Sequence, residues 1–92
     1  SITIPESVAG IGDHAFHGCT GLTSITIGEG ATSIEDGAFY GCTSLTAVNF
    51  LGDAPKAGEE VFKGATPNIY RKPEAKGWGD KFAGRPVKLI RE

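Results

Sequence analysis

The two cysteines, Cys19 and Cys42, are the side chains of this 92-residue sequence with the clearest capacity for chemistry. As an oxidised pair they would form a disulfide; as free thiols they would act as small apolar groups, because unpaired cysteine is among the most buried residue types. They lie 23 positions apart, and an alanine, Ala65, stands a further 23 positions on. Since an apolar role suits all three positions, we predict two free thiols in a core.

Two histidines, His14 and His17, lie three residues apart and can share one face of a turn. A metal site in a protein needs three or four ligands, and no further histidine or cysteine is placed to complete one. The internal repeat described below puts Gly37 and Tyr40 where these histidines stand. We therefore predict surface histidines, with no metal ion and no other cofactor.

Tyr70 and Trp78 can form an aromatic platform for a sugar or a peptide. The alternative, which we favour, is that they cover the end of a hydrophobic core. Serine and threonine are frequent, yet there is neither a Ser-His-Asp order nor a nucleophile-elbow motif. The isolated Gly77-Trp78-Gly79 does not make a phosphate-binding loop. These patterns do not indicate catalysis, and we predict that the chain is not an enzyme.

An internal repeat defines the elements that position these residues. Residues 1–23 laid over residues 24–46 are identical at 14 of 23 positions, and a degenerate third copy spans residues 47–68. Residues 69–92 depart from the pattern and mix large aromatic with charged side chains. Such a composition suits the C-terminal cap of a stack of repeats, which needs an apolar inner face and a polar outer one.

Each copy predicts one coil of a solenoid. Its opening Ser-Ile-Thr-Ile alternates and predicts a strand with both isoleucines on one face. A short helical or 3-10 segment returns the chain; Asp13 and Asp36 can cap its first N–H groups, and Gly18 and Gly41 end it. A period of 23 falls within the range of about 20–29 for leucine-rich repeats. We predict a leucine-rich-repeat solenoid with consecutive parallel strands at Ile2–Ile4, Ile25–Ile27, Val48–Phe50, Ile69–Tyr70 and Val87–Leu89.

The repeat pattern resembles the BspA-like leucine-rich repeats of bacterial surface proteins. The signature is a strand followed by Pro-x-Ser-Val-x-x-Ile-x-x-x-Ala-Phe-x-x-Cys-x-x-Leu. Residues 1–22 match it almost position for position, and residues 24–45 match it with Gly28 in place of the proline. The resemblance implies placement outside the cell or on its surface, with a role in adhesion or protein binding. It supplies no catalytic residues. Because the sequence has no methionine and opens in the middle of the repeat pattern, we interpret it as a fragment of a larger protein.

The charge of the chain is divided unevenly along the sequence. All nine lysines and arginines lie at or after Lys56, so residues 1–55 carry −6 and residues 56–92, with nine bases and five acids, carry +4. Nucleic acid is disfavoured as a partner because the first two repeats offer no cation to a phosphate. No apolar run approaches the roughly 18 residues that cross a bilayer, so we expect no membrane insertion by this segment.

Small polar side chains form a stripe along the side of the predicted strands that faces away from the core. The candidate partner-binding residues of this stripe are Ser1, Thr3, Ser24, Thr26 and Asn49. The alternative is that threonine simply suits a strand and solvates well. The strand side is where solenoids present binding surfaces, so the stripe is a candidate floor of a partner site in a longer solenoid. For a segment this short, with little concave surface, we favour the alternative.

We predict a protein-interaction or adhesion module whose partner is a protein on a host or on another cell surface. One alternative is a purely structural stalk or terminal cap. Another is a carbohydrate-binding surface that uses Tyr70 and Trp78. The first coil opens on a strand with no coil before it, and uncovered repeat faces favour self-association. We therefore also predict contact between two copies through the N-terminal coil.

Overall fold

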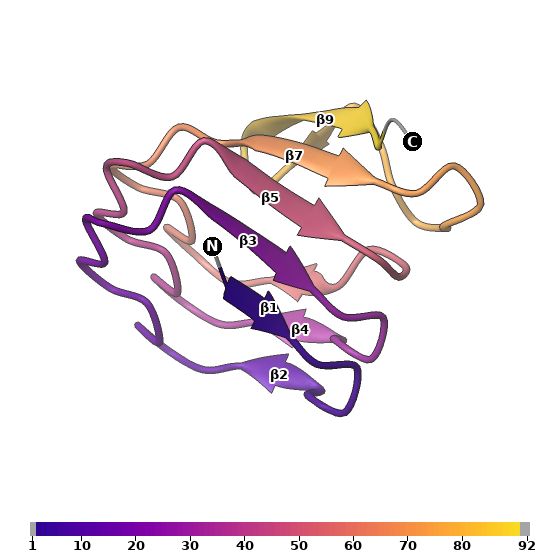
Figure 1. Ribbon diagram of the computed structural model, residues 1–92, viewed down its shortest axis with the longest axis horizontal. Coiled ribbons are helices and arrows are strands. Elements are labelled where there is room, and N and C mark those ends of the chain that lie inside the picture. The colour runs from indigo at the N-terminus through magenta and orange to yellow at the C-terminus, as the bar shows by residue number, and fades with distance from the viewer. Residues whose placement is uncertain (1, 91–92) are drawn as a thin grey trace.

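Parallel strands from successive coils form the larger of two sheets. The computed structural model describes residues 2–90 (Figure 1). The strand order is β1-β3-β5-β7-β9-β8, and every neighbouring pair is parallel except β8 and β9. The bounds are Ile2–Ile4 (β1), Ser24–Ile27 (β3), Ala47–Phe50 (β5), Asn68–Arg71 (β7), Arg85–Leu89 (β9) and Lys81–Phe82 (β8). The predicted series of five parallel strands in chain order is confirmed.

The register of this sheet follows the sequence repeat at first and then contracts. Ile2 pairs with Ile25, 23 residues further along the chain. Val48 pairs with Ile69 after a step of 21, and Ile69 pairs with Val87 after a step of 18. The coils therefore shorten toward the C-terminus. The boundaries 47–68 for a third repeat and 69–92 for a cap stay predictions.

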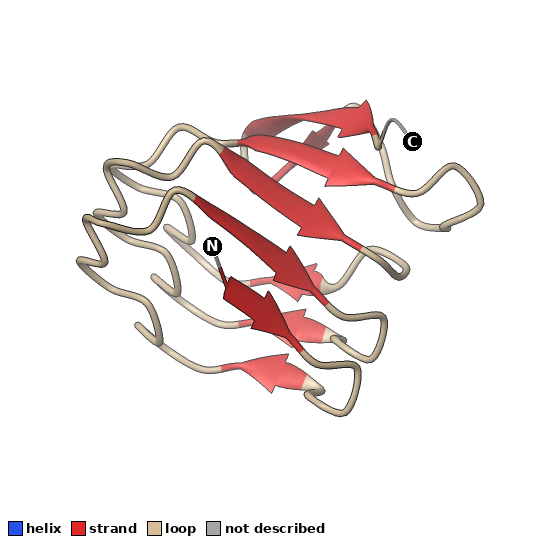
Figure 2. Ribbon diagram, viewed as in Figure 1, coloured by secondary structure: helices blue, strands red, loops and turns tan. Residues whose placement is uncertain are grey.

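A second, smaller sheet lies on the opposite side of each coil. Its strands are Gly10–Ile11 (β2), Ser33–Ile34 (β4) and Lys56–Ala57 (β6), parallel and in that order. Turns connect the two sheets, and Figure 2 shows strands and loops with no helix over residues 2–90. The solenoid is confirmed, but the expectation of helical or 3-10 returns is wrong for this part of the chain.

Left-handed residues explain why the returns are not helical. In each coil two positions four residues apart have positive φ: His14 (56°) and Gly18 (72°), Gly37 (63°) and Gly41 (74°), Glu60 (56°) and Gly64 (77°). A right-handed helix cannot contain such residues. Backbone groups of the return instead bond to the next coil, as where the Phe16 amide donates to the Ala38 carbonyl at 2.7 Å.

Aspartates in the turns of the coils bridge neighbouring coils rather than cap helices. The Asp13 carboxylate accepts a hydrogen bond from the Asp36 amide at 3.2 Å, and the Asp36 carboxylate accepts one from the Glu59 amide at 2.8 Å. Asp53 accepts one from the Lys76 amide at 2.8 Å in the same manner. The predicted capping role is therefore corrected: each carboxylate satisfies a backbone N–H of the following coil.

The core consists of columns of equivalent side chains from successive coils. The rings of Phe16, Phe39 and Phe62 stack with centroid separations of 5.2 and 5.5 Å. Phe39 and Phe62 are buried, whereas Phe16 is only half-buried because it lies in the first coil of the described residues and is covered from one side alone. Cys19 is half-buried for the same reason, and Cys42 is fully buried. The aromatic column is continuous across three coils, as the sequence repeat predicts, but its burial is incomplete in the first coil.

The first coil leaves apolar surface uncovered. The Ile2 side chain is 42% exposed and is one of two large exposed hydrophobic residues among those described. Within residues 2–90, β1 and β2 lie at the ends of their sheets. Self-association through this coil stays a prediction.

Candidate functional site

One face of the larger sheet points away from the core and carries the predicted stripe. Along β3 and β5 the burial alternates, because neighbouring side chains of a strand point to opposite faces. Register places a single outward column across five strands: Thr3, Thr26, Asn49, Tyr70 and Lys88. A second column joins Ser24, Ala47 and Asn68. Ser1 lies outside the described residues.

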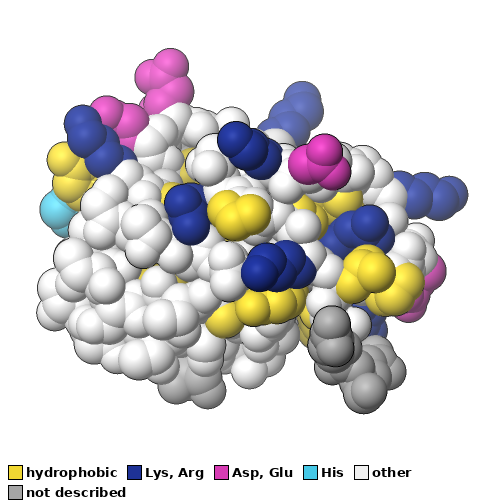
Figure 3. Space-filling model, turned by 90° about the horizontal axis from the view of Figure 1, so that it is seen from above, with side chains coloured by type: hydrophobic (Ala, Val, Ile, Leu, Met, Phe, Trp, Pro, Cys, Tyr) yellow, Lys and Arg dark blue, Asp and Glu magenta, His cyan; other side chains and the backbone are white. Residues whose placement is uncertain are grey.

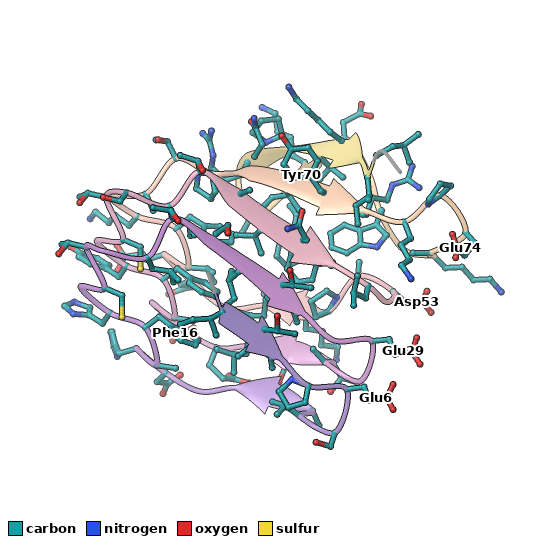
Figure 4. The ribbon with its side chains drawn as sticks, in the orientation of Figure 1. Glu6, Phe16, Glu29, Asp53, Tyr70 and Glu74 are labelled. Carbon is teal, nitrogen blue, oxygen red and sulfur yellow. The ribbon has the colours of Figure 1, made fainter. Side chains whose placement is uncertain are left out.

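This face is flat and polar over β1 and β3 and becomes hollowed at its C-terminal end. A groove of about 860 Å³ is lined by Asn49, Tyr70, Pro73, Lys88, Leu89 and Ile90. Leu89 is 50% exposed, and within residues 2–90 Lys88 is the one charged residue that lines the groove. Figure 4 shows Tyr70 on β7, at the end of the sheet to which the groove belongs. The sequence stripe thus continues into a site with apolar and cationic character.

Hydrogen bonds to backbone carbonyl groups hold the walls of the groove. The Arg71 guanidinium donates from Nη1 to the carbonyl oxygens of Lys72 and Pro73, both at 3.3 Å, and so fixes the loop that carries Pro73. The Ile90 amide donates to the Arg71 carbonyl at 2.8 Å and anchors the other wall. Both walls therefore depend on the last residue of β7.

Tyr70 and Trp78 take different positions. Tyr70 lines the groove, whereas Trp78 does not. The Trp78 ring packs against Phe50 and Phe82 at 4.9 and 5.2 Å, and its indole N–H donates to the Gly52 carbonyl at 3.2 Å. These contacts favour the alternative in which Trp78 covers the core, and they leave Tyr70 as the aromatic side chain of the outward face.

The groove residues Pro73, Lys88, Leu89 and Ile90 were missed by sequence reasoning. Val87, Lys88 and Leu89 were correctly predicted as the strand that follows Ile69–Tyr70, but the sequence did not indicate that Lys88 and Leu89 line a groove with Tyr70. A signal was present in the charge pattern, because a lysine stands in the column that threonines occupy earlier.

Acidic side chains gather along one edge of the larger sheet. Figure 4 shows Glu6, Glu29, Asp53 and Glu74 in the turns that follow the strands. Their clustering follows from the repeat, which brings equivalent turns next to one another. No group of three or more histidine, cysteine or acidic side chains suited to a metal ion occurs among residues 2–90.

The histidines form part of an aromatic stack on the return turns. The His17 ring stacks on Tyr40 with centroids 5.0 Å apart and planes inclined by 15°. His14 meets His17 edge to face at 5.4 Å, and its ring lies against Gly37 of the next coil. The two histidines are brought together as expected, and their neighbours are aromatic and glycine residues.

Both cysteines are free thiols, as predicted. The Cys42 thiol donates to the Phe16 carbonyl at 3.0 Å, across the gap between coils. Burial raises the pKa of the Cys42 thiol above its usual 9.0, with a further rise from the nearby Cys19 and an opposing hydrogen bond from the Cys19 backbone. Cys42 is therefore the less reactive thiol, because the thiolate is the nucleophile.

We expect alkylation to distinguish the two thiols. In denaturant without reductant the chain should titrate two thiols; in the folded state Cys19 should react first and Cys42 only slowly. Cys19→Ser and Cys42→Ser variants assign each phase. The pKa of the Cys42 thiol is higher in the folded than in the unfolded chain, so the protonated thiol stabilises the folded state. This stabilisation is complete below pH 9.0 and falls as the pH rises above that value. A chain that titrates no thiols would contain a disulfide and contradict this assignment.

Comparison with known proteins agrees with the geometry of the coils. A family model described as a BspA-type leucine-rich repeat region, of six copies, matches residues 1–71. No curated protein and no solved structure matches the chain. Over the described residues no helix has the length and apolar character to cross a bilayer. Since the match covers most of the sequence, the chain belongs to the BspA-type leucine-rich-repeat family.

Proposed function

We propose that this chain is a protein-interaction module whose partner binds the outward face of the larger sheet, as part of a bacterial cell-surface protein with a role in adhesion. The observation that carries the proposal is the continuous outward column from Thr3 to Lys88, which ends in a groove. Repeat proteins offer such faces as extended binding surfaces because the scaffold beneath them is rigid and regular.

The chemistry of this face supports a protein partner. Its small side chains leave the strands accessible, and hydroxyl and amide groups on Thr3, Thr26 and Asn49 can donate and accept hydrogen bonds. Its C-terminal end adds Tyr70 and an exposed Leu89. Apolar and aromatic anchors surrounded by polar groups are typical of protein interfaces. Membership of the family supports a repeat module, and the cell-surface placement is part of the proposal.

Selection from a displayed library of random short peptides tests the proposal. Peptides enriched on the immobilised chain should bind at least about tenfold more weakly to an Asn49→Glu variant, because the new carboxylate enters the middle of the face. The matched control is Ser44→Glu, which adds the same charge in an exposed turn before β5. Peptides that bind both variants equally well would overturn the proposal.

A further inference from the structure

The groove at the C-terminal end of the outward face has a defined chemistry. We infer that it selects a peptide segment in which an aliphatic side chain stands next to a carboxylate. This inference rests on the proposed function and adds the class of partner. It follows from what lines the groove: three aliphatic residues, one aromatic ring, one amide and one cation.

The aliphatic part of the ligand is indicated by exposed apolar surface. Pro73, Leu89 and Ile90 line one hollow, and Leu89 is 50% exposed over its whole surface. Over residues 2–90 the one other large hydrophobic residue with comparable exposure is Ile2, at the far end of the sheet. Covering an exposed leucine and the matching ligand side chain removes apolar surface from water, which favours association by roughly 25 cal/mol per Å².

The carboxylate is indicated by charge. Lys88 stands in register beside Tyr70, and none of the groove-lining residues within 2–90 is acidic. Seen from this end of the molecule, Figure 3 shows lysine and arginine side chains around hydrophobic patches. The C-terminal part of the chain, residues 56–92, carries +4 overall. A negative ligand is therefore attracted to Lys88 in the groove, whereas the edge formed by Glu6, Glu29, Asp53 and Glu74 repels it and confines it to the groove.

Other ligands fit the lining less well. A sugar is held by stacking on an open aromatic face, yet the groove offers a single, half-buried tyrosine among aliphatic residues. A second copy of the chain could place its acidic first half against the groove. The outward face of that half carries the small side chains of Thr3 and Thr26, however, and so lacks a large apolar anchor for the groove. The short segment with an aliphatic and an acidic side chain matches both features of the groove.

A charge-reversal selection tests this inference. A displayed library of random short peptides is selected in parallel on the unaltered chain and on Lys88→Glu, Leu89→Ser and Lys81→Glu variants. Lys81 is an exposed lysine of β8 that does not line the groove, so its variant makes the same charge change elsewhere. All four proteins are checked for folding by thermal melting before selection.

The expected result is enrichment of aspartate or glutamate next to an aliphatic residue on the unaltered chain and on Lys81→Glu. On Lys88→Glu the same peptides should bind at least about tenfold more weakly, and lysine or arginine should replace the acid in newly selected peptides. Leu89→Ser should remove the aliphatic preference and keep the acidic one.

Three outcomes would overturn the inference. Peptides unaffected by Lys88→Glu but weakened by Asn49→Glu would keep the proposed function and remove the groove's charge preference. Peptides affected by neither variant would remove both. The third outcome assigns the groove to another ligand when acidic peptides are not enriched. Glycan-array binding that Tyr70→Ala abolishes would then assign it to a sugar, and a dimer in sedimentation that Lys88→Glu dissociates would assign it to a second copy.

Discussion

Replacing Phe39 by alanine should lower the free energy of unfolding by about 3–5 kcal/mol. The ring is fully buried and stacks between Phe16 and Phe62, so truncation leaves a cavity that the neighbouring coils cannot close without losing their own register. Small domains have total stabilities of about 5–15 kcal/mol, so the loss is a large share of the whole. Thermal or denaturant unfolding of purified protein measures it directly.

Phe16→Ala is the matched control for this experiment. It removes the same side chain from the same repeat position, but Phe16 is half-buried and has one stacked neighbour instead of two. We expect it to cost about half as much, because less buried apolar surface is lost. If the Phe16 variant were destabilised as strongly as the Phe39 variant, stacking between coils would not be the main source of the effect.

Replacing Gly30 by alanine should destabilise the chain by about 3 kcal/mol through overpacking. A Cβ atom at this position would overlap the Glu6 carbonyl oxygen and lie 3.0 Å from the Glu6 carbonyl carbon. These are backbone atoms of the preceding coil, so they cannot rotate away as a side chain would. The turn after β3 must therefore shift, and the shift loosens the contact between the first two coils.

The control for this variant is Gly21→Ala, because nothing lies within 4 Å of a Cβ atom there and its φ is not left-handed. It should change stability little or raise it slightly, since alanine restricts the unfolded chain more than glycine does. For Gly30→Ala the midpoint of thermal unfolding should fall by about 4–8 °C for each kcal/mol of stability lost. Equal melting temperatures for the Gly30 and Gly21 variants would show that Gly30 does not pack closely against the Glu6 backbone.

The sequence by itself determined the repeat, and with it the strands and the core columns. Fourteen matches in 23 positions fix which residues are equivalent, so Ile25 must pair with Ile2 and Phe39 must stack on Phe16. Alternation within Ser-Ile-Thr-Ile fixes which side chains face outward. This information is local or strictly periodic, and a periodic stack converts it directly into contacts.

Only the tertiary structure decided the backbone conformation of the return segments, because that conformation depends on hydrogen bonds to the next coil. The pattern around Asp13 is compatible with a capped helical turn, but that turn would leave backbone groups of the return unpaired between coils. With His14 and Gly37 left-handed, alternate amides instead donate to the following coil, and Asp13 accepts from Asp36. Backbone pairing across coils outweighed the helical preference within one coil.

The groove was likewise decided by tertiary structure. Thr3, Thr26 and Asn49 follow from the repeat, because each occupies the same position in its coil. Lys88 continues this column because β9 pairs with β7 after a register step of 18 residues, and Leu89 lines the groove next to it. No period in the sequence encodes that shortened step; the aromatic packing of the last segment on Phe50 and the pairing of β9 with β7 set it, and they bring an exposed leucine and a lysine to the end of the face.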